Sequence, residues 1–484
     1  MRTYSPPPCR NPPRRRPVAT RTEQDFLGTQ QIPAEAYWGV HSARAVENFP
    51  ISGQTVAQWP ELIRALAFVK KAAARANLEL GVLDTTRAGA IERACDDLIG
   101  GALHEQFVVD VIQGGAGTST NMNANEVIAN RALEHLGHAR GEYRHLHPND
   151  HVNASQSTND VYPTALRLAA WAGIDTLIAA MGELRGAFEA KAAEFRSVLK
   201  IGRTQLQDAV PMTLGQEFLA FAVMIGEDEQ RLREARALIG EVNLGATAIG
   251  TGINAPAGYT ETVVPLLAHV SGVPVVMAAN LVEATQDTGA FVQLSGVLKR
   301  VACKLSKTCN DLRLLSSGPQ AGFGDIHLPA RQAGSSIMPG KVNPVIPEVM
   351  NQVAFEVIGN DVTITMASEA GQLQLNAFEP IMGWSLHKSI SHLTRACRTL
   401  QINCVEGIAP NHELLRRRVA ESVTLVTALN PIIGYEKAAL IAKTALAEGG
   451  TIAETAERLG IMGRAEMEAL LVPERLTQPV RLVA

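Results

Sequence analysis

Apolar residues recur at steps of three and four through the middle of the chain, a spacing that puts side chains on one face of an α-helix. Alternating steps of three and four form the seam between nearly parallel helices, so the pattern predicts a mainly α fold around a central bundle of five long helices. The predicted helices cover residues 166–188, 214–242, 291–315, 347–364 and 382–405.

The remainder of the chain divides at polar, proline-rich and glycine-rich stretches. The first twenty residues carry six prolines and no acid, which predicts a disordered tail and neither a secretory signal nor a transit peptide. Shorter helices at 61–78 and 86–103 precede the bundle, interrupted by polar segments at 114–123 and 147–153. The predicted organisation is a tail (1–20), an N-terminal domain (21–157), the bundle domain (158–411) and a small C-terminal helical domain (412–484).

Composition narrows the class of protein. The net charge is -4 and the tail holds five arginines, so the rest of the chain is near -9, which argues against nucleic-acid binding. Aromatic residues make up 5%, which suits closely packed helices. No apolar run approaches the roughly 18 residues of a membrane helix. The six cysteines form no CxxC pair, which disfavours a zinc ribbon and fits a reduced cytoplasmic setting.

Residues able to do chemistry gather in four polar segments next to predicted helix ends. Each segment alone could simply cap a helix, because serine, threonine and asparagine are the usual capping residues. Four of them, far apart in sequence, favour a binding site. They are 117–125, 155–160, 202–208 and the loop Gly-Ser-Ser-Ile-Met-Pro-Gly-Lys-Val-Asn-Pro at 334–344.

The loop at 334–344 resembles the signature of the fumarase/aspartase superfamily at every position, and the resemblance extends through all four segments from Arg21 onward. These enzymes eliminate a group from the carbon next to a carboxylate-bearing carbon and release fumarate. The resemblance implies a homotetramer whose central helices form one shared bundle. It also implies active sites assembled from segments of three chains.

Several positions resemble the aspartases more than the fumarases. Fumarases typically carry serine where this chain has Thr158, and histidine where it has Gln205. The runs 345–349 and 367–376 also resemble aspartases. The implied activity is the reversible elimination of ammonia from L-aspartate to give fumarate through an enediolate. Two alternatives stay open, a fumarate hydratase of class II type and a catalytically inactive structural relative.

The resemblance and this chemistry together assign roles. Ser335 is the implied base, and Gly334 and Gly340 are the predicted hinges of a lid. Hydroxyl donors would stabilise the enediolate, a cation and an amide would hold the α-carboxylate, and acceptors would receive the leaving ammonium. The predicted donors are Thr118, Ser119, Ser157, Thr158 and Ser336; the α-carboxylate contacts are Lys341 and Asn343; the ammonium contacts are Asn159 and Gln205, with Thr204 as a substrate-binding residue beside them.

His145, His147, Asp150 and His151 are metal-ligating residue types at short spacing and are candidates for a metal site. Pro148 breaks any single helix face there, so no metal site is predicted. No cofactor is expected to be required. The resemblance implies that a divalent cation such as Mg²⁺ can activate the enzyme, without assigning ligands. The expected partners are the small molecules L-aspartate, fumarate and ammonium, with no nucleic acid and no membrane.

Overall fold

The computed structural model describes residues 19–470 and 472–478. The fold is mainly α, with 62% helix, as the periodicity predicts. The predicted tail lies outside the described residues apart from positions 19 and 20. The chain forms two compact units that do not follow chain order: unit 1 takes residues 19–169, 240–287 and 370–381, and unit 2 takes most of the rest.

Unit 1 is built on four helices, with α2 packed against α3 and α7, and α3 packed against α4. An antiparallel hairpin pairs Thr20 with Pro33 and Asp25 with Gly28. The elements are β1 Thr20–Asp25, β2 Gly28–Pro33, α1 Val40–Asn48, η1 Val56–Gln58, α2 Pro60–Glu79, α3 Thr85–Ile99, η2 His104–Gln106, α4 Thr118–His135, η3 Pro148–Val152, the start of α5 Thr158–Glu194, β5 Glu241–Val242, α7 Tyr259–Ser271, β6 Val276–Met277 and α8 Leu281–Ala284.

The start of α1 is held by a carboxylate from α4. Glu126 is fully buried and accepts hydrogen bonds from the backbone N–H groups of Gly39, His41 and Ser42 and from the Ser42 hydroxyl. These N–H groups have no partner within the helix, so the carboxylate satisfies donors that burial would leave orphaned. Burial nevertheless raises the pKa of Glu126 to about 7. This contact fixes α4, whose first turn carries predicted site residues.

The asparagine-rich segment at 114–123 was predicted to interrupt the helices of this region, and that prediction is wrong from Thr118 onward. Helix α4 begins at Thr118, so Asn121, Asn123 and Asn125 lie inside it and are buried. Asparagine is a weak helix former because its side chain competes for backbone hydrogen bonds. Here the amide groups find tertiary partners instead, which offsets that preference.

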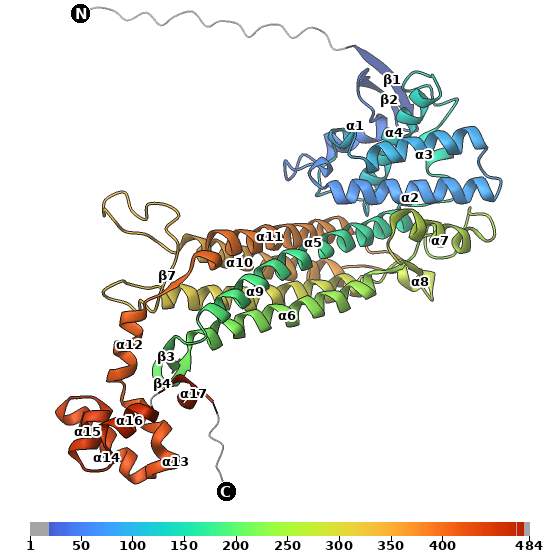
Figure 1. Ribbon diagram of the computed structural model, residues 1–484. Helices are drawn as coiled ribbons and strands as arrows, with labels where there is room; N and C mark the ends of the chain where they lie inside the picture. The colour runs from blue at the N-terminus through green and yellow to red at the C-terminus, as the bar shows by residue number, and fades with distance from the viewer. Residues whose placement is uncertain (1–18, 471, 479–484) are drawn as a thin grey trace, which may run out of the picture. The chain divides into compact units, whose positions relative to one another are not determined.

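Unit 2 contains the five-helix bundle, formed by α5, α6, α9, α10 and α11, which run side by side in Figure 1. All five predicted long helices are present. The elements are the rest of α5, β3 Leu199–Thr204, β4 Gln207–Thr213, α6 Leu214–Ile239, α9 Gly289–Leu315, β7 Ile326–His327, α10 Val345–Glu369, α11 Glu379–Asn403, η4 Val405–Gly407, β8 Ala409–Pro410, α12 His412–Glu421, η5 Val423–Leu429, α13 Asn430–Ile433, α14 Tyr435–Glu448, α15 Ile452–Arg458, α16 Arg464–Leu470 and α17 Pro473–Leu476.

Aromatic packing joins α5 to α6 at one end of the bundle. The rings of Phe188 and Phe218 have centroids 6.0 Å apart, and those of Phe188 and Phe221 are 5.7 Å apart. Phe195 meets Phe218 edge to face at 5.2 Å. These tilted and perpendicular geometries are the favoured arrangements of aromatic pairs. The hairpin of β3 and β4 follows directly from this anchored end of α5.

The C-terminal helices have a core of their own inside unit 2. Leu425, Leu429, Ile441, Ile452 and Met467 are buried in one apolar cluster that also contacts Leu199 of β3. Short helices such as α15 and α16 are marginal by themselves, so this cluster supplies their stability. The helices from η5 onward therefore share a core inside unit 2, and the predicted C-terminal domain at 412–484 stays a prediction.

Within the described residues, one helix is long and apolar enough by length and composition to cross a membrane. This helix is α5, and more than half of its most apolar window is buried inside the protein. Burial of that kind is what a core helix needs, and α5 supplies the first helix of the bundle.

Candidate active site

The first turn of α4 presents Thr118 and Ser119. The preceding residue, Gly117, has φ of +88°, and a Cβ atom there would overlap the ring of Tyr162. Thr118 is exposed and donates its hydroxyl hydrogen to the Gly115 carbonyl at 2.7 Å. Its oxygen is therefore left as an acceptor in this geometry, whereas the sequence assigned Thr118 a donor role. Ser119 is half-buried beside it.

The start of α5 is a reciprocal cap formed by Ser157 and Asp160. The Ser157 N–H donates to Asp160 Oδ1 at 3.0 Å, and the Asn159 N–H donates to Ser157 Oγ at 3.2 Å. Asp160 is fully buried, and its other oxygen accepts the backbone N–H groups of Gly245 and Thr247. Burial raises the pKa of Asp160 to about 6. The cap holds Ser157, Thr158 and Asn159 in a defined half-buried turn.

The amide of Asn159 has one defined orientation. Its Nδ2 donates to the Ala248 carbonyl at 2.8 Å, and its own backbone carbonyl accepts from Asn243 Nδ2 at 3.0 Å. A carbonyl oxygen can only accept, so Nδ2 must face Ala248. The Oδ1 atom is then the part of the Asn159 side chain left to accept a hydrogen bond, as the predicted contact with an ammonium group requires.

The structure brings the two predicted segments of unit 1 together through a buried residue. Asn121 Nδ2 lies 3.0 Å from Thr158 Oγ1, joining α4 to the first turn of α5. Sequence reasoning missed Asn121 and its neighbours Asn125, Asn153 and Lys70. The available signals were asparagine recurring at every second position of a helix, and a lysine within an alanine-rich apolar helix.

The predicted substrate-binding residues Thr204 and Gln205 lie at an exposed hairpin turn in unit 2. Thr204 pairs with Gln207, so Gln205 and Leu206 form a two-residue turn, with φ of +53° and +64°. Two successive left-handed residues correspond to a type I′ turn, which glycine and asparagine usually occupy. Each non-glycine residue held there costs roughly 1–3 kcal/mol. The hairpin therefore has to be held by its surroundings.

The loop around Ser335 is closed at its neck. The Gly334 N–H donates to the Lys341 carbonyl at 2.7 Å, and Asn343 Nδ2 donates to the Gly334 carbonyl at 2.9 Å. Within this loop Ser335 Oγ accepts the backbone N–H groups of Ile337 and Met338, at 3.1 and 3.0 Å. Ser336 and Lys341 are exposed. The amide of Asn343 thus helps to shape the loop as well as being a predicted carboxylate contact.

The predicted site residues divide between the two units. Thr118, Ser119, Ser157, Thr158 and Asn159 belong to unit 1, while Thr204, Gln205, Ser335, Ser336, Lys341 and Asn343 belong to unit 2. Among the described residues of unit 2, no hydrogen bond or ion pair joins the Ser335 loop to the turn at Gln205. The binding roles assigned from the sequence accordingly stay predictions.

Two histidines of the candidate metal segment, His147 and His151, accept backbone hydrogen bonds. His147 Nδ1 accepts the N–H groups of Asn149 and Asp150, at 3.1 and 3.3 Å, and so caps η3. His151 Nδ1 accepts the His147 N–H at 2.7 Å. In the part of the chain that the structure describes, no three His, Cys, Asp or Glu side chains are grouped to hold a metal ion.

Two family models match the chain. The lyase model covers residues 28–359 and the model of the fumarase C C-terminus covers residues 425–478. The chain therefore belongs to the fumarase/aspartase superfamily of lyases.

Within that superfamily, its curated relatives include aspartate ammonia-lyases. That of Pseudomonas aeruginosa is 58% identical, covering 96% of this chain and 98% of its own length. That of Escherichia coli is 52% identical, with coverage of 95% and 96%.

Two solved structures show the same fold. A fumarate lyase:delta crystallin from Brucella melitensis bound to cobalt is 58% identical, with a TM-score of 0.93, covering 95% of this chain and all of its own. The class II fumarase from Schistosoma mansoni is 33% identical, with a TM-score of 0.89, covering 96% of this chain and all of its own. Identity is thus much higher to aspartate ammonia-lyases than to this fumarase.

Proposed function

We propose that the chain is an aspartate ammonia-lyase that reversibly eliminates ammonia from L-aspartate to give fumarate, with Ser335 as the base. The observation that carries the proposal is the environment of Ser335 Oγ, which accepts two backbone N–H groups. A serine oxygen is a base only when its negative charge is stabilised, and two fixed donors supply that stabilisation. The names of the relatives at 52–58% identity support the choice of substrate.

In the proposed reaction the oxyanion form of Ser335 Oγ removes a proton from Cβ of L-aspartate and becomes a hydroxyl group. The electron pair of the broken C–H bond moves onto the β-carboxylate, which becomes a doubly charged enediolate. Hydroxyl groups aimed at those oxygens stabilise the charge, and they do so more strongly in the transition state than in the substrate. Thr158, Ser157, Ser119 and Ser336 are the proposed donors.

The enediolate then collapses to the double bond of fumarate, and the Cα–N bond breaks. The electron pair of that bond stays on nitrogen, so the ammonium group of the substrate leaves as neutral ammonia. Its N–H hydrogens need acceptors, and Asn159 Oδ1 is left to accept because the Asn159 amide donates to the Ala248 carbonyl. The Thr118 hydroxyl donates its hydrogen to the Gly115 carbonyl, so its oxygen is also left to accept a hydrogen bond. Gln205 and Thr204 complete the proposed ammonium contacts. Gln205 does not titrate, so it can hold an amine leaving group without exchanging a proton with it.

Lys341 and Asn343 are proposed to hold the α-carboxylate. Lys341 is exposed and supplies a positive charge, while Asn343 Oδ1 and Nδ2 lie at the neck of the same loop. Movement at Gly340, which has φ of +81°, would carry Lys341 with the loop. Activation by a divalent cation is part of the proposal, since the Brucella relative was solved bound to cobalt. No ligand set for that cation is proposed.

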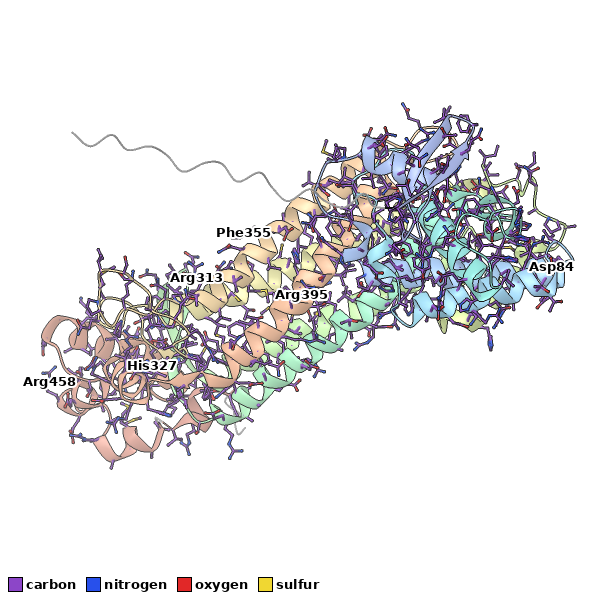
Figure 2. The ribbon with its side chains drawn as sticks, turned by 90° about the horizontal axis from the view of Figure 1, so that it is seen from above. Asp84, Arg313, His327, Phe355, Arg395 and Arg458 are labelled. Carbon is purple, nitrogen blue, oxygen red and sulfur yellow. The ribbon has the colours of Figure 1, made fainter. Side chains whose placement is uncertain are left out.

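The proposed assembly is a homotetramer with a shared bundle. Phe355, Val362 and Met366 lie at steps of seven and four on α10, so they share one face, and all three are exposed. Figure 2 labels Phe355, which is 63% exposed, on this helix. Leu219 and Val223 form a second exposed apolar pair on α6. Apolar stripes of this kind are usual at contacts between subunits.

We place the enzyme in the cytoplasm. The five described cysteines are free, and four of them are buried. Free thiols persist in reducing compartments, where disulfides are rare.

The decisive experiment is a comparison of substrates with the purified chain. L-aspartate and L-malate are supplied separately, and fumarate is followed by its ultraviolet absorbance. Signal from L-aspartate alone is the expected result. Signal from L-malate alone would select fumarate hydratase. No signal from either substrate, with a folded protein, would favour the inactive structural relative.

A further inference from the structure

Unit 1 contains a buried cluster of one lysine and three asparagines directly behind Thr158. Lys70 comes from α2, Asn121 and Asn125 come from α4, and Asn153 follows η3. Lys70 and Asn125 are fully buried and Asn121 is 1% exposed. Three donors meet at Asn153 Oδ1: Lys70 Nζ at 2.9 Å, Asn121 Nδ2 at 3.2 Å and Asn125 Nδ2 at 3.1 Å.

The orientation of Asn153 is fixed by two independent partners. Its Nδ2 donates to the Gln156 carbonyl at 3.3 Å, and a carbonyl can only accept. On the other side, Lys70 in its ammonium form can only donate, and the atom that faces it is then an oxygen. Because Asn153 presents Oδ1 to the cluster, Asn121 and Asn125 must both turn their NH₂ groups toward it.

That orientation decides the state of the Thr158 hydroxyl. Asn121 Nδ2 has a second hydrogen, which it donates to Thr158 Oγ1 at 3.0 Å. The threonine oxygen is therefore an acceptor on the side of α4, and its own hydrogen must point to another acceptor. A threonine in the first turn of a helix would otherwise rotate freely between donor and acceptor states.

We infer that Asn121 is a positioning residue that keeps the Thr158 hydroxyl turned as a donor toward the carboxylate that becomes the enediolate. The inference deepens the proposed function and rests on it. A donor already oriented before reaction needs no reorganisation while the negative charge develops. Lys70 and Asn153 act through Asn121, because they fix its amide so that Nδ2, and not Oδ1, lies against Thr158 Oγ1.

Asn125 offers a matched control because it makes the same bond to Asn153 Oδ1 from the next turn of α4. Asn121 alone of the two also donates to Thr158, whereas the second contact of Asn125 Nδ2 is with the sulfur of Met122 in its own helix. An effect that came only from disturbing the buried cluster would appear at both positions. An effect that came through Thr158 would appear at position 121 alone.

The test reverses the polarity of the hydrogen bond with Asn121→Asp. The new carboxylate can only accept, so the Thr158 hydrogen turns toward it and away from the substrate. We expect kcat for L-aspartate to fall at least about tenfold with KM changed less than about threefold, because the lost donor acts mainly in the transition state. Asn125→Asp puts the same charge in the same cluster and should keep kcat within about threefold of wild type.

A double-mutant cycle with Thr158→Val gives the second readout. Once the hydroxyl is absent, Asn121→Asp should reduce kcat by less than about twofold more, since both changes remove one interaction. Equal losses for the 121 and 125 variants, or losses at 121 and 158 that multiply, would overturn the inference. Should the Asn121→Asp protein not fold, Asn121→Ala takes its place in the cycle with the same expected loss of additivity.

The outcomes also separate this inference from the proposed function. Wild-type protein that makes no fumarate from L-aspartate overturns the proposed function and the inference together. Normal kcat in Thr158→Val removes Thr158 from the site and overturns the inference, while leaving the assignment to aspartate intact. A poor Thr158→Val enzyme combined with a normal Asn121→Asp enzyme overturns the inference alone.

Discussion

The guanidinium of Arg203 and the carboxylate of Asp325 lie 2.7 Å apart, and the Asp325 side chain is fully buried. The same carboxylate meets Arg418 of α12 at 2.5 Å and Lys200 of β3 at 3.5 Å. The ring of Phe323 lies 4.2 Å from the Arg203 guanidinium. One carboxylate thus ties the β3 hairpin, which carries Thr204 and Gln205, to the segment after α9 and to α12.

Replacing this carboxylate should be costly for stability. Asp325→Asn leaves Arg203 and Arg418 beside a neutral amide in a buried setting, and loss of one partner of a buried ion pair typically costs about 3–5 kcal/mol. We expect a fall of several degrees in Tm, measured by calorimetry. Glu234→Gln is the control, because its pair with Arg231 is half exposed on both sides and should be worth less than about 1 kcal/mol. Equal Tm values for the two variants would contradict this account.

Ser335→Ala tests the base directly. The variant should fold normally, because the side chain makes only local bonds to Ile337 and Met338 in its own loop. Removal of a catalytic base should lower kcat by several orders of magnitude. Ser271→Ala is the matched control, since that serine also makes only local bonds: it donates to the Leu267 carbonyl and accepts the Val273 N–H. Turnover near that of wild type in folded Ser335→Ala would exclude Ser335 as the base.

Lys341→Ala should raise KM for L-aspartate as well as lower kcat. An ammonium that holds the α-carboxylate contributes to binding of substrate and transition state alike. Steady-state kinetics with L-aspartate measure both constants. A KM equal to that of wild type would show that Lys341 does not contact the substrate.

Lys70 should impose a pH dependence on stability. Burial lowers the pKa of Lys70 from 10.5 to about 7. Between these values the unfolded chain binds more protons than the folded chain, so the lysine makes the free energy of unfolding rise with pH. Lys70→Met removes this contribution, and the Tm of wild type minus that of the variant should increase from pH 7 to pH 10. A constant difference across that range would mean that Lys70 titrates normally in the folded protein.

Subunit exchange tests whether the proposed tetramer shares active sites between chains. Asn159→Ala and Ser335→Ala, each inactive alone, are mixed in equal amounts, dissociated with mild denaturant and refolded together. If these two residues of a site come from different chains, about a quarter of the sites regain both, and activity should return to about that level. Continued inactivity after verified subunit exchange would exclude the shared site and leave the substrate assignment untouched.

The bundle could be predicted from sequence because its signal repeats. Steps of three and four between apolar residues recur over many turns, so a few residues that break the pattern do not obscure a helix. The predicted and observed helices differ at their ends. Helix α6, for example, stops at Ile239 and not at residue 242 because β5 begins at Glu241. The segments of unit 1 that return at 240–287 and 370–381 were not foreseen, because long-range packing leaves no local periodicity.

The sequence predicts only those parts of the candidate site whose residue types have strong local backbone preferences. The Ser335 loop is rich in glycine and proline, residues whose backbone preferences are visible in sequence. The turn at Gln205 and Leu206 carries neither glycine nor asparagine, so its residue types do not predict the left-handed backbone found there. Asn121 was hidden in a similar way, since its role depends on Asn153, which is 32 residues away in the chain.

The contact between Gly117 and Tyr162 limits how this protein can evolve. Any side chain at position 117 would have to occupy space that the tyrosine ring already fills, and the backbone there is left-handed. A larger residue at position 117 alone would collide with the tyrosine ring, and a smaller residue at position 162 alone would leave a cavity. A tolerated change therefore has to alter both residues together. Among related sequences that keep the turn before α4, positions 117 and 162 should vary as a pair.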